Sequence, residues 1–353
     1  MRARTSESTR NGLEVTIDEF TLDTLFEGDV LKATMNRYRP RPNTREQIDG
    51  GYVLLLAHGM GFHKEHWEPT LYRLFDLDEG NPGSCRILEA WALDYPNHGE
   101  AAELNDTVLR RRNEPLTIQS YTDAFSAFYK SGLLGNIQDQ KRKIVLIGHS
   151  AGTIAVTLMT TLFDDPGQQF DKVILVEPTM WDADVSSRMS DMYHMGAKTT
   201  ALRRNRWASK EAAYDWFRTR PPWSNWDPTV LKLFAEYGLR ESNAGSEDKQ
   251  GVVLQCDPVH EAHCFVEAPP TVYKLMGQLG RLCGLVPFHI IFGERDDMFS
   301  RKAKDSIINK DKGRVFASVT RIKGAGHLIV QERPAQLADV LHMILHNHGG
   351  SKL

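Results

Sequence analysis

The sequence has few cysteines, no long apolar run and no marked excess of charge of either sign. Only four of its 353 residues are cysteine, and no two of them form a CxxC pair, so neither a disulfide framework nor a zinc ribbon is indicated. The 43 basic and 46 acidic side chains give a formal net charge of −3, which excludes the basic surface expected of a nucleic-acid-binding protein. No apolar stretch is long enough to span a bilayer, so no transmembrane segment is expected.

One short segment does gather groups that can bind metals. Cys256, His260, His263 and Cys264 lie close together, but their spacing matches none of the common zinc templates. We therefore predict no metal site there and expect no cofactor. The polar N-terminal residues lack the apolar core of a secretory signal, so the cysteines are expected to be free, buried thiols.

What the sequence does contain is a series of short apolar runs. Hydrophobic residues make up 41% and charged residues 25%, as in a folded globular protein. Each run soon meets a glycine or a polar residue, which is typical of a strand buried on both faces of a parallel sheet. With helical patterns between them, the runs predict an α/β protein with a mostly parallel sheet flanked by helices. The runs are 51–57, 87–93, 143–147, 172–176, 288–292 and 318–322, with a hairpin or edge strands at 14–22 and 31–38 and helices at 153–162 and 334–346.

The alternation of strand and helix patterns stops between the fourth and fifth runs. Residues 180–285 hold five of the seven tryptophans and clear helix signals, such as Asp227-Pro228 at a helix start. We interpret this stretch as a helical lid (cap) insertion. Residues 1–179 and 286–350 would then form the core domain, leaving residues 351–353 as a tail.

A motif that carries chemistry follows the third run. Gly148-His149-Ser150-Ala151-Gly152 lies between a predicted strand and a predicted helix, the context of a nucleophile elbow. The two glycines allow a tight turn that projects the Ser150 hydroxyl out of the sheet. Ser150 is therefore the candidate nucleophile.

A serine hydroxyl needs a base to take its proton and an acid to orient that base. His327 follows the last predicted strand, and the chain order serine, acid, histidine favours it as the base. For the acid we favour Asp296, which follows the strand at 288–292, and expect it within hydrogen-bond reach of His327 Nδ1. The alternatives are Asp297, expected to turn away, and Glu177, expected farther off at the end of the preceding strand.

Acyl transfer also needs hydrogen-bond donors for the developing oxyanion. The backbone N–H of Ala151, directly after the nucleophile, is one candidate. The N–H of Met60 is the other, because it lies in the loop His58-Gly59-Met60-Gly61 after the first core strand.

These motifs resemble the α/β-hydrolase superfamily over about residues 45–348, with Asp94–Gly99 as an additional family-like turn. The segment from His58 to Pro69 is similar to fungal peroxisomal hydrolases, including the yeast peroxisomal lipase and hydrolases of AK-toxin-type, host-selective toxin biosynthesis. The resemblance implies cleavage of a carboxylic ester or thioester of an acyl or lipid-like small molecule, in fungal toxin (secondary metabolite) biosynthesis. The alternatives are an acyltransferase with the same triad and a non-catalytic ligand-binding protein on a hydrolase scaffold. Epoxide or haloalkane hydrolysis is disfavoured, since it needs a carboxylate in place of Ser150.

The sequence ends in Ser351-Lys352-Leu353, which matches a peroxisomal targeting signal. Such a tripeptide is bound by a soluble import receptor and does not anchor a protein to a membrane. The predicted location is therefore the peroxisome, and the predicted partners are the import receptor and a small-molecule acyl substrate.

Overall fold

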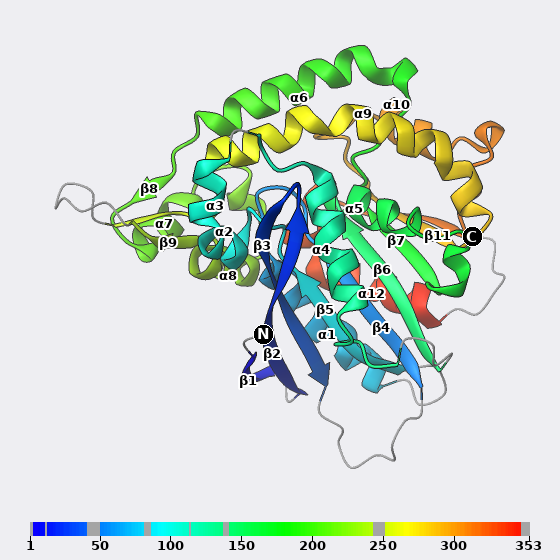
Figure 1. Ribbon diagram of the computed structural model, residues 1–353, viewed down its shortest axis with the longest axis horizontal. Helices are drawn as coiled ribbons and strands as arrows, with labels where there is room; N and C mark the ends of the chain where they lie inside the picture. Colours follow the sequence, from blue (N-terminus) through cyan, green and yellow to red (C-terminus); the bar gives the residue numbers. More distant parts are fainter. Residues whose placement is uncertain are drawn as a thin grey trace.

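The core of the protein is a single nine-stranded sheet with helices on both faces (Figure 1). The computed structural model describes residues 3–10, 13–40, 50–80, 86–112, 114–136, 141–242 and 251–346. The strand order across the sheet is β1-β2-β3-β5-β4-β6-β7-β11-β12. The strands are β1 (Ala3–Arg10), β2 (Leu13–Phe26), β3 (Asp29–Pro40), β4 (Gly51–Ala57), β5 (Arg86–Leu93), β6 (Arg142–His149), β7 (Lys172–Val176), β11 (Phe288–Gly293) and β12 (Ser318–Ile322).

Six of these strands, from β5 to β12 across the sheet, run parallel to one another. They confirm the six predicted strands and the predicted fold class. Every residue of β4 is buried, as expected for a central strand covered on both faces. The predicted N-terminal hairpin is present as β2 and β3, which join β5 through an antiparallel pairing, and β1 extends the sheet at its edge.

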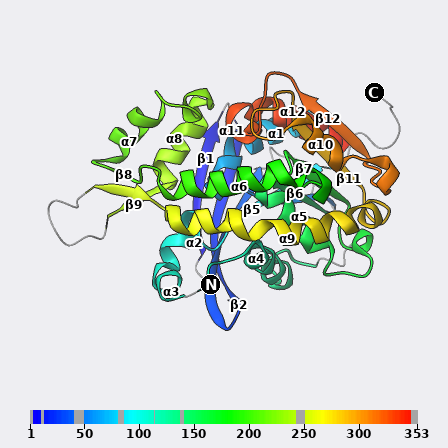
Figure 2. The same cartoon turned by 90° about the horizontal axis from the view of Figure 1, so that it is seen from above.

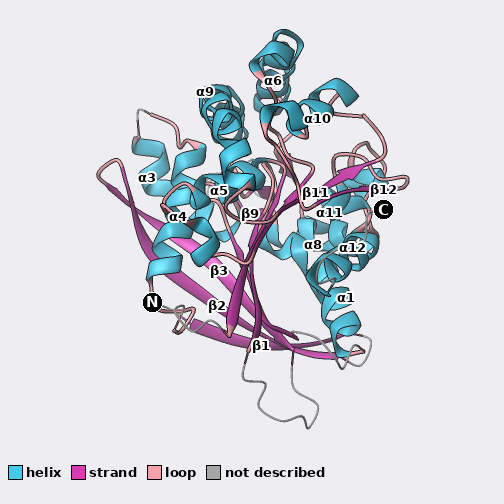
Figure 3. Cartoon of the chain, turned by 90° about the vertical axis from the view of Figure 1, so that its right-hand side faces the viewer, coloured by secondary structure: helices cyan, strands magenta, loops and turns pink. Residues whose placement is uncertain are grey.

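Two layers of helices enclose the sheet (Figure 3). One face packs against α4 (Ile118–Lys130), α5 (Ala151–Thr160) and part of α9 (Pro258–Cys283), with Phe125, Ile154 and Leu279 in the core. The other face packs against α1 (Glu68–Glu79) and α12 (Pro334–His346), with Leu74 and Leu341 in the core. Shorter helices connect these layers: α2 (Gly99–Leu104), α3 (Asp106–Arg111), α10 (Arg301–Ile307) and α11 (Ile329–Glu332).

Between β7 and β11 the chain leaves the main sheet. This stretch contains α6 (Ser186–Ala201), α7 (Lys210–Phe217), α8 (Pro228–Tyr237) and α9 (Pro258–Cys283), with a small sheet of β8 (Arg206–Trp207), β10 (Val252–Leu254) and β9 (Leu239–Glu241). Helices α6 and α9 pack side by side across one end of the core (Figure 2). Helix α8 begins where Asp227-Pro228 predicted, with the Asp227 carboxylate accepting the Thr229 N–H at 2.8 Å.

The described part of the chain contains no helix that is both long enough and apolar enough to cross a membrane.

The turn between β6 and α5 depends on two glycines. A Cβ at Gly148 would lie 2.5 Å from the Gly152 carbonyl oxygen, and one at Gly152 would lie 2.4 Å from the Ala57 oxygen on β4. Ser150, between them, has φ 52° and ψ −121°, outside the regions that side-chain-bearing residues prefer. The close approach of α5 to β4 therefore leaves no room for a side chain at either of the two glycines.

We predict that Gly152→Ala destabilises the protein by about 1–3 kcal/mol, the scale of overpacking a filled core. The clash is with backbone atoms of a central strand, which cannot move aside. Gly277→Ala is the matched control, since a Cβ there meets nothing within 4 Å in helix α9, and alanine favours a helix by up to about 1 kcal/mol over glycine. Urea unfolding measures both variants, and equal stability of the two would contradict the steric argument.

Candidate active site

The nucleophile and base predicted from the sequence meet at the carboxyl edge of the parallel strands. Ser150 follows β6 and His327 follows β12, and the His327 Nε2 atom lies 2.9 Å from the Ser150 Oγ atom. Both residues are buried, with exposed fractions of 7% and 3%. A neutral imidazole in this position can accept the hydroxyl proton, which is the geometry that nucleophilic catalysis by serine requires.

The carboxylate beside His327 belongs to Glu177. Its Oε2 atom lies 3.2 Å from His327 Nδ1, and the side chain is 1% exposed. Glu177 directly follows β7 and has a positive φ of 47°, while its N–H donates to the Ile291 carbonyl oxygen at 2.8 Å. The Gly293 N–H donates to the second carboxylate oxygen, Oε1, at 2.6 Å. Both oxygens are therefore held, and one of them faces the imidazole.

The expectation that Asp296 would contact His327 Nδ1 is wrong. The Asp296 carboxylate instead accepts a hydrogen bond from Arg301 Nε at 3.0 Å and lies 3.5 Å from Lys304 Nζ. The acid beside His327 is instead the residue that follows β7. Strand β7 lies between β6 and β11, so its end is nearer to the nucleophile than the end of β11 is. Glu177 reaches the histidine from the end of β7, and the Gly293 N–H on β11 holds its other carboxylate oxygen. The expectation that Glu177 lies farther from His327 than Asp296 does is therefore also wrong.

Asp297 was expected to turn away, but it faces the histidine backbone. Its Oδ1 atom accepts the N–H groups of His327 and Met298, both at 2.9 Å. Partial burial alone would raise the pKa of this carboxyl group, yet the hydrogen bond from His327 N–H and the pairing with Arg295 lower it. Asp297 thus fixes the loop that carries the base without touching the imidazole ring.

The two predicted oxyanion donors lie on segments that border Ser150. Ala151 is the first residue of α5, where a backbone N–H has no partner within the helix. The loop after β4 passes so close that a Cβ at Gly59 would lie 2.9 Å from the Ser150 Cβ. Met60 follows Gly59 and lines the adjacent cavity. Among the described residues no hydrogen bond uses the N–H of Met60 or of Ala151.

Two further buried histidines brace these loops as neutral groups. His58 Nε2 accepts the Tyr95 N–H at 3.1 Å, and His58 Nδ1 donates to the Gly59 carbonyl oxygen at 2.7 Å. Burial lowers the pKa of His58 to about 4 and that of His149 to about 3. His149 Nε2 donates to the His327 carbonyl oxygen at 2.9 Å, so the elbow holds the base loop directly.

A largely apolar cavity of about 490 Å³ lies under the insertion, next to the triad residues. It is bordered by Met60 from the oxyanion loop and by Phe299, whose ring packs edge-on against the His327 ring at 4.9 Å between centroids. Its size is within the range of small-molecule sites. Seven of its other lining residues are aromatic: Phe62, Tyr193, Phe217, Trp223, Trp226, Phe234 and Phe265.

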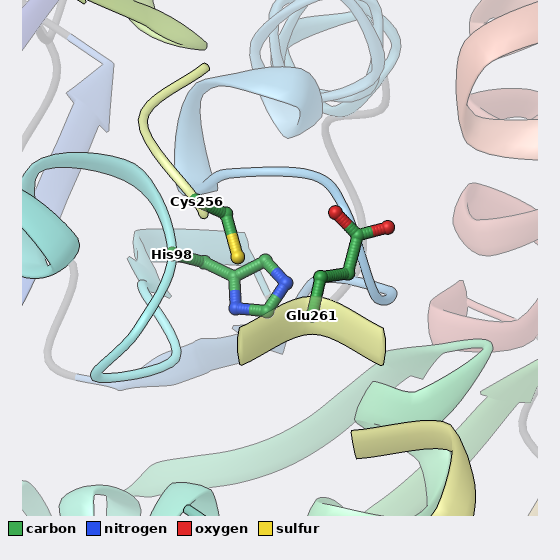
Figure 4. A group of neighbouring side chains, drawn as sticks. All are labelled: His98, Cys256 and Glu261. Atoms are coloured by element: carbon green, nitrogen blue, oxygen red, sulfur yellow. The ribbon is translucent and has the colours of Figure 1, made fainter. Parts of the chain in front are cut away.

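Three buried side chains come close enough to suggest a metal site: His98, Cys256 and Glu261, with ligand atoms within 4.8 Å of one another (Figure 4). All three already have partners, and the Cys256 thiol donates to the Asp257 carbonyl oxygen at 3.7 Å. His98 Nε2 accepts the Gly61 N–H at 2.9 Å, and the Glu261 carboxylate pairs with Arg203 at both oxygens. Burial raises the pKa of the Cys256 thiol, which disfavours the thiolate that a metal needs. The group does not fit a metal ion.

The cysteines in the described part of the chain are free, and both Cys256 and Cys264 are buried. Cys85 lies outside the described residues, as does the predicted targeting tripeptide.

Comparison with known proteins agrees with this architecture. The profile of the Alpha/beta hydrolase family matches residues 54–340. The chain therefore belongs to the alpha/beta hydrolase family, a family of hydrolases. Abhydrolase domain-containing proteins AFT2-1 and ACTT2-1 from Alternaria alternata are 24% and 26% identical to it over 231 residues, covering 57% of this chain and 82% of each relative.

Solved structures show the same fold. The peroxisomal alpha-beta-hydrolase Lpx1 from Saccharomyces cerevisiae aligns with a TM-score of 0.71 and 19% identity, covering 95% of this chain and 90% of that one. The thioesterase domain from the curacin biosynthetic pathway aligns with a TM-score of 0.59 and 12% identity, over 97% and 99% of the two chains.

We predict that Glu177→Gln slows the reaction of Ser150 with a fluorophosphonate probe by about 10⁴-fold, the loss that an amide replacement causes in serine proteases. The amide cannot hold the imidazole in the required tautomer or stabilise its cation. Asp296→Asn is the matched control and should react close to the wild-type rate, because this carboxylate contacts only Arg301 and Lys304. If Asp296→Asn reacted slowly with the probe and Glu177→Gln reacted at the wild-type rate, the acid of the triad would be Asp296, after β11.

Proposed function

We propose that the protein is a serine hydrolase that cleaves a carboxylic ester or thioester with an apolar acyl group. The observation that carries this proposal is the hydrogen-bonded series Ser150–His327–Glu177 beside an aromatic cavity. The hydroxyl oxygen of Ser150 attacks the carbonyl carbon while His327 takes its proton. Glu177 orients the imidazole and stabilises the cation that forms.

The same groups complete the cycle. The backbone N–H groups of Met60 and Ala151 are placed to stabilise the negative oxygen of the tetrahedral intermediate. His327 then returns the proton to the leaving alcohol or thiol, which leaves an acyl group on Ser150. A water molecule, activated by His327 in the same way, releases the acid and restores the serine.

The cavity supports an apolar substrate. Burying each methylene group of an acyl chain among its aromatic walls contributes about 0.8 kcal/mol to binding. The insertion between β7 and β11 supplies most of these walls, including Trp223 and Trp226. We assign residues 180–285 the role of a lid that shields the acyl chain from water, on a core of residues 1–179 and 286–350.

The proposed location is the peroxisome, reached through an import receptor that binds Ser351-Lys352-Leu353. The likeness in fold to a peroxisomal hydrolase of yeast supports it. The proposed role in fungal toxin biosynthesis rests on the resemblance of the segment from His58 to Pro69 to hydrolases of host-selective toxin biosynthesis.

We predict that the purified protein hydrolyses p-nitrophenyl esters and acyl-CoA thioesters, with a lower KM for medium-length acyl chains than for acetyl. Ser150→Ala is expected to lower the rate by about 10⁶-fold while the protein stays folded. Release of p-nitrophenol or free thiol measures turnover, and circular dichroism checks the fold. A folded wild-type protein that neither turns over these substrates nor reacts with a fluorophosphonate would instead be a ligand-binding protein. Residual activity of Ser150→Ala near the wild-type level would exclude Ser150 as the nucleophile.

We predict that deleting residues 351–353 moves the protein from peroxisomes to the cytosol and leaves hydrolysis unchanged. The test is fluorescence microscopy of an N-terminally tagged chain in fungal cells that lack an untagged copy. Replacing Lys352 with glutamate in the full-length chain is the matched control, because it alters the tripeptide without shortening the chain. Peroxisomal import of both altered chains would contradict the assignment of the tail.

A further inference from the structure

A buried lysine contacts the carboxylate that orients the base. Lys304 lies on α10, between the buried apolar residues Ala303 and Ile307, and its side chain is only 2% exposed. Its Nζ atom lies 2.8 Å from Oε1 of Glu177, the oxygen that does not face His327. Nothing in the local sequence marks this lysine as buried, and lysine side chains usually lie on the surface.

The remaining donors of this ammonium group are also used. Lys304 Nζ donates to the carbonyl oxygens of Arg295 at 3.0 Å and Gly293 at 3.3 Å. A lysine is rarely this deeply buried unless its charge is paired, since moving an unpaired ammonium group out of water is costly. Glu177 supplies the buried countercharge, at 1% exposure. The ammonium group is therefore fixed by its partners, and it is one carboxylate away from the imidazole.

Resting on the proposed function, we propose that Lys304 is a positioning residue that holds the Glu177 carboxylate against His327 and keeps the Glu177–His327 pair free of an extra proton under mildly acidic conditions. Lys304 and the Gly293 N–H fix one oxygen of the carboxylate, so the other oxygen is left to face His327 Nδ1. The lysine contacts neither the substrate cavity nor Ser150 and acts only through Glu177.

The sign of the electrostatic effect follows from counting charge. With Lys304 present, the group of three is neutral when His327 can act as a base, and it becomes a cation when the pair takes up a proton. Without the lysine, the same step starts from an anion and ends at a neutral pair, which is easier. Losing the lysine must therefore move the acid limb of the pH profile to higher pH, whichever of the two partners holds the extra proton.

The other charged groups around the Glu177–His327 pair already have partners of opposite charge. Asp296, which faces Lys304 at 3.5 Å, also pairs with Arg301. Arg295 pairs with Asp297 and with Glu332 behind the histidine loop.

Three more groups border the pair from neighbouring elements. The Glu294 carboxylate accepts the Gly324 N–H at 2.8 Å. Asp182, which meets α10 through its N–H and Ser306, pairs with Lys312 and Arg314. On the elbow side, burial lowers the pKa of His149 to about 3, so its ring carries no charge in the range tested. Lys304 is thus the cation that directly contacts the triad carboxylate within the described residues.

The experiment measures how fast a fluorophosphonate probe labels Ser150 from about pH 5 to about pH 9, the range in which histidine titrates. The rate constant needs no knowledge of the natural substrate. For Lys304→Met and Lys304→Gln we expect the midpoint of the acid limb to rise by about one pH unit, the usual effect of removing a nearby opposite charge from a carboxylate. Lys304→Arg, which keeps the charge, should restore the wild-type midpoint.

Lys302→Met is the matched control, because this neighbouring lysine is exposed on the same helix and should leave the midpoint unchanged. Folded Lys304 variants with reduced labelling but a wild-type midpoint would show a structural role only and overturn the inference. If no Lys304 variant folds, the wild-type profile decides. An acid limb centred no higher than about 6.5, the ordinary histidine value, supports the inference, and one above that value overturns it. Absence of labelling in the wild type at every pH would instead refute the proposed function.

Discussion

The contact between helix α5 and strand β4 at Gly152 is the constraint on which the site depends. It brings the start of α5 against the backbone of Ala57, so the chain after β6 must turn within a single residue. Ser150 takes up that turn in a backbone conformation that costs on the order of 1–3 kcal/mol. The surrounding core holds it there, helped by the hydrogen bond from the Ser150 N–H to the Val176 carbonyl oxygen at 3.0 Å. The carboxyl edge of a rigid sheet thus presents one hydroxyl.

The strand beside the nucleophile ends in the same way. Glu177 also has a positive φ, and its N–H is tied to β11 just as the Ser150 N–H is tied to β7. Two adjacent parallel strands therefore end in strained residues whose side chains face the same loop after β12. His327 lies between them, with Nε2 toward the serine and Nδ1 toward the glutamate. Because three separate strands of one sheet hold these groups, their distances are set before any substrate binds, which is the preorganisation that catalysis needs.

The charges around the site are arranged in two different ways. Near the base, buried charges are paired with specific partners, as Glu177 is with Lys304, which keeps the acid oriented. The cavity is different, since its wall is largely apolar and its charged groups are Arg203, Arg204 and Glu261, of which Arg203 and Glu261 form a pair. That division suits a reaction in which charge develops at one carbonyl group while the rest of the substrate is apolar.

The sequence by itself determined the parallel strands, the elbow and the histidine. These depend on local patterns: apolar runs bounded by polar residues, two glycines around Ser150, and the place of His327 after the last strand. The identity of the carboxylate was decided only by the tertiary structure. Asp296 and Glu177 both follow parallel strands. Their sequence contexts do not reveal which strand lies next to the nucleophile or which carboxylate is held by cations away from His327. In the folded protein Arg301 and Lys304 contact Asp296, while Glu177, held by the Gly293 N–H, contacts His327. The burial of Lys304 is likewise a product of packing, because its position on a short helix gives no sign of the carboxylate that faces it.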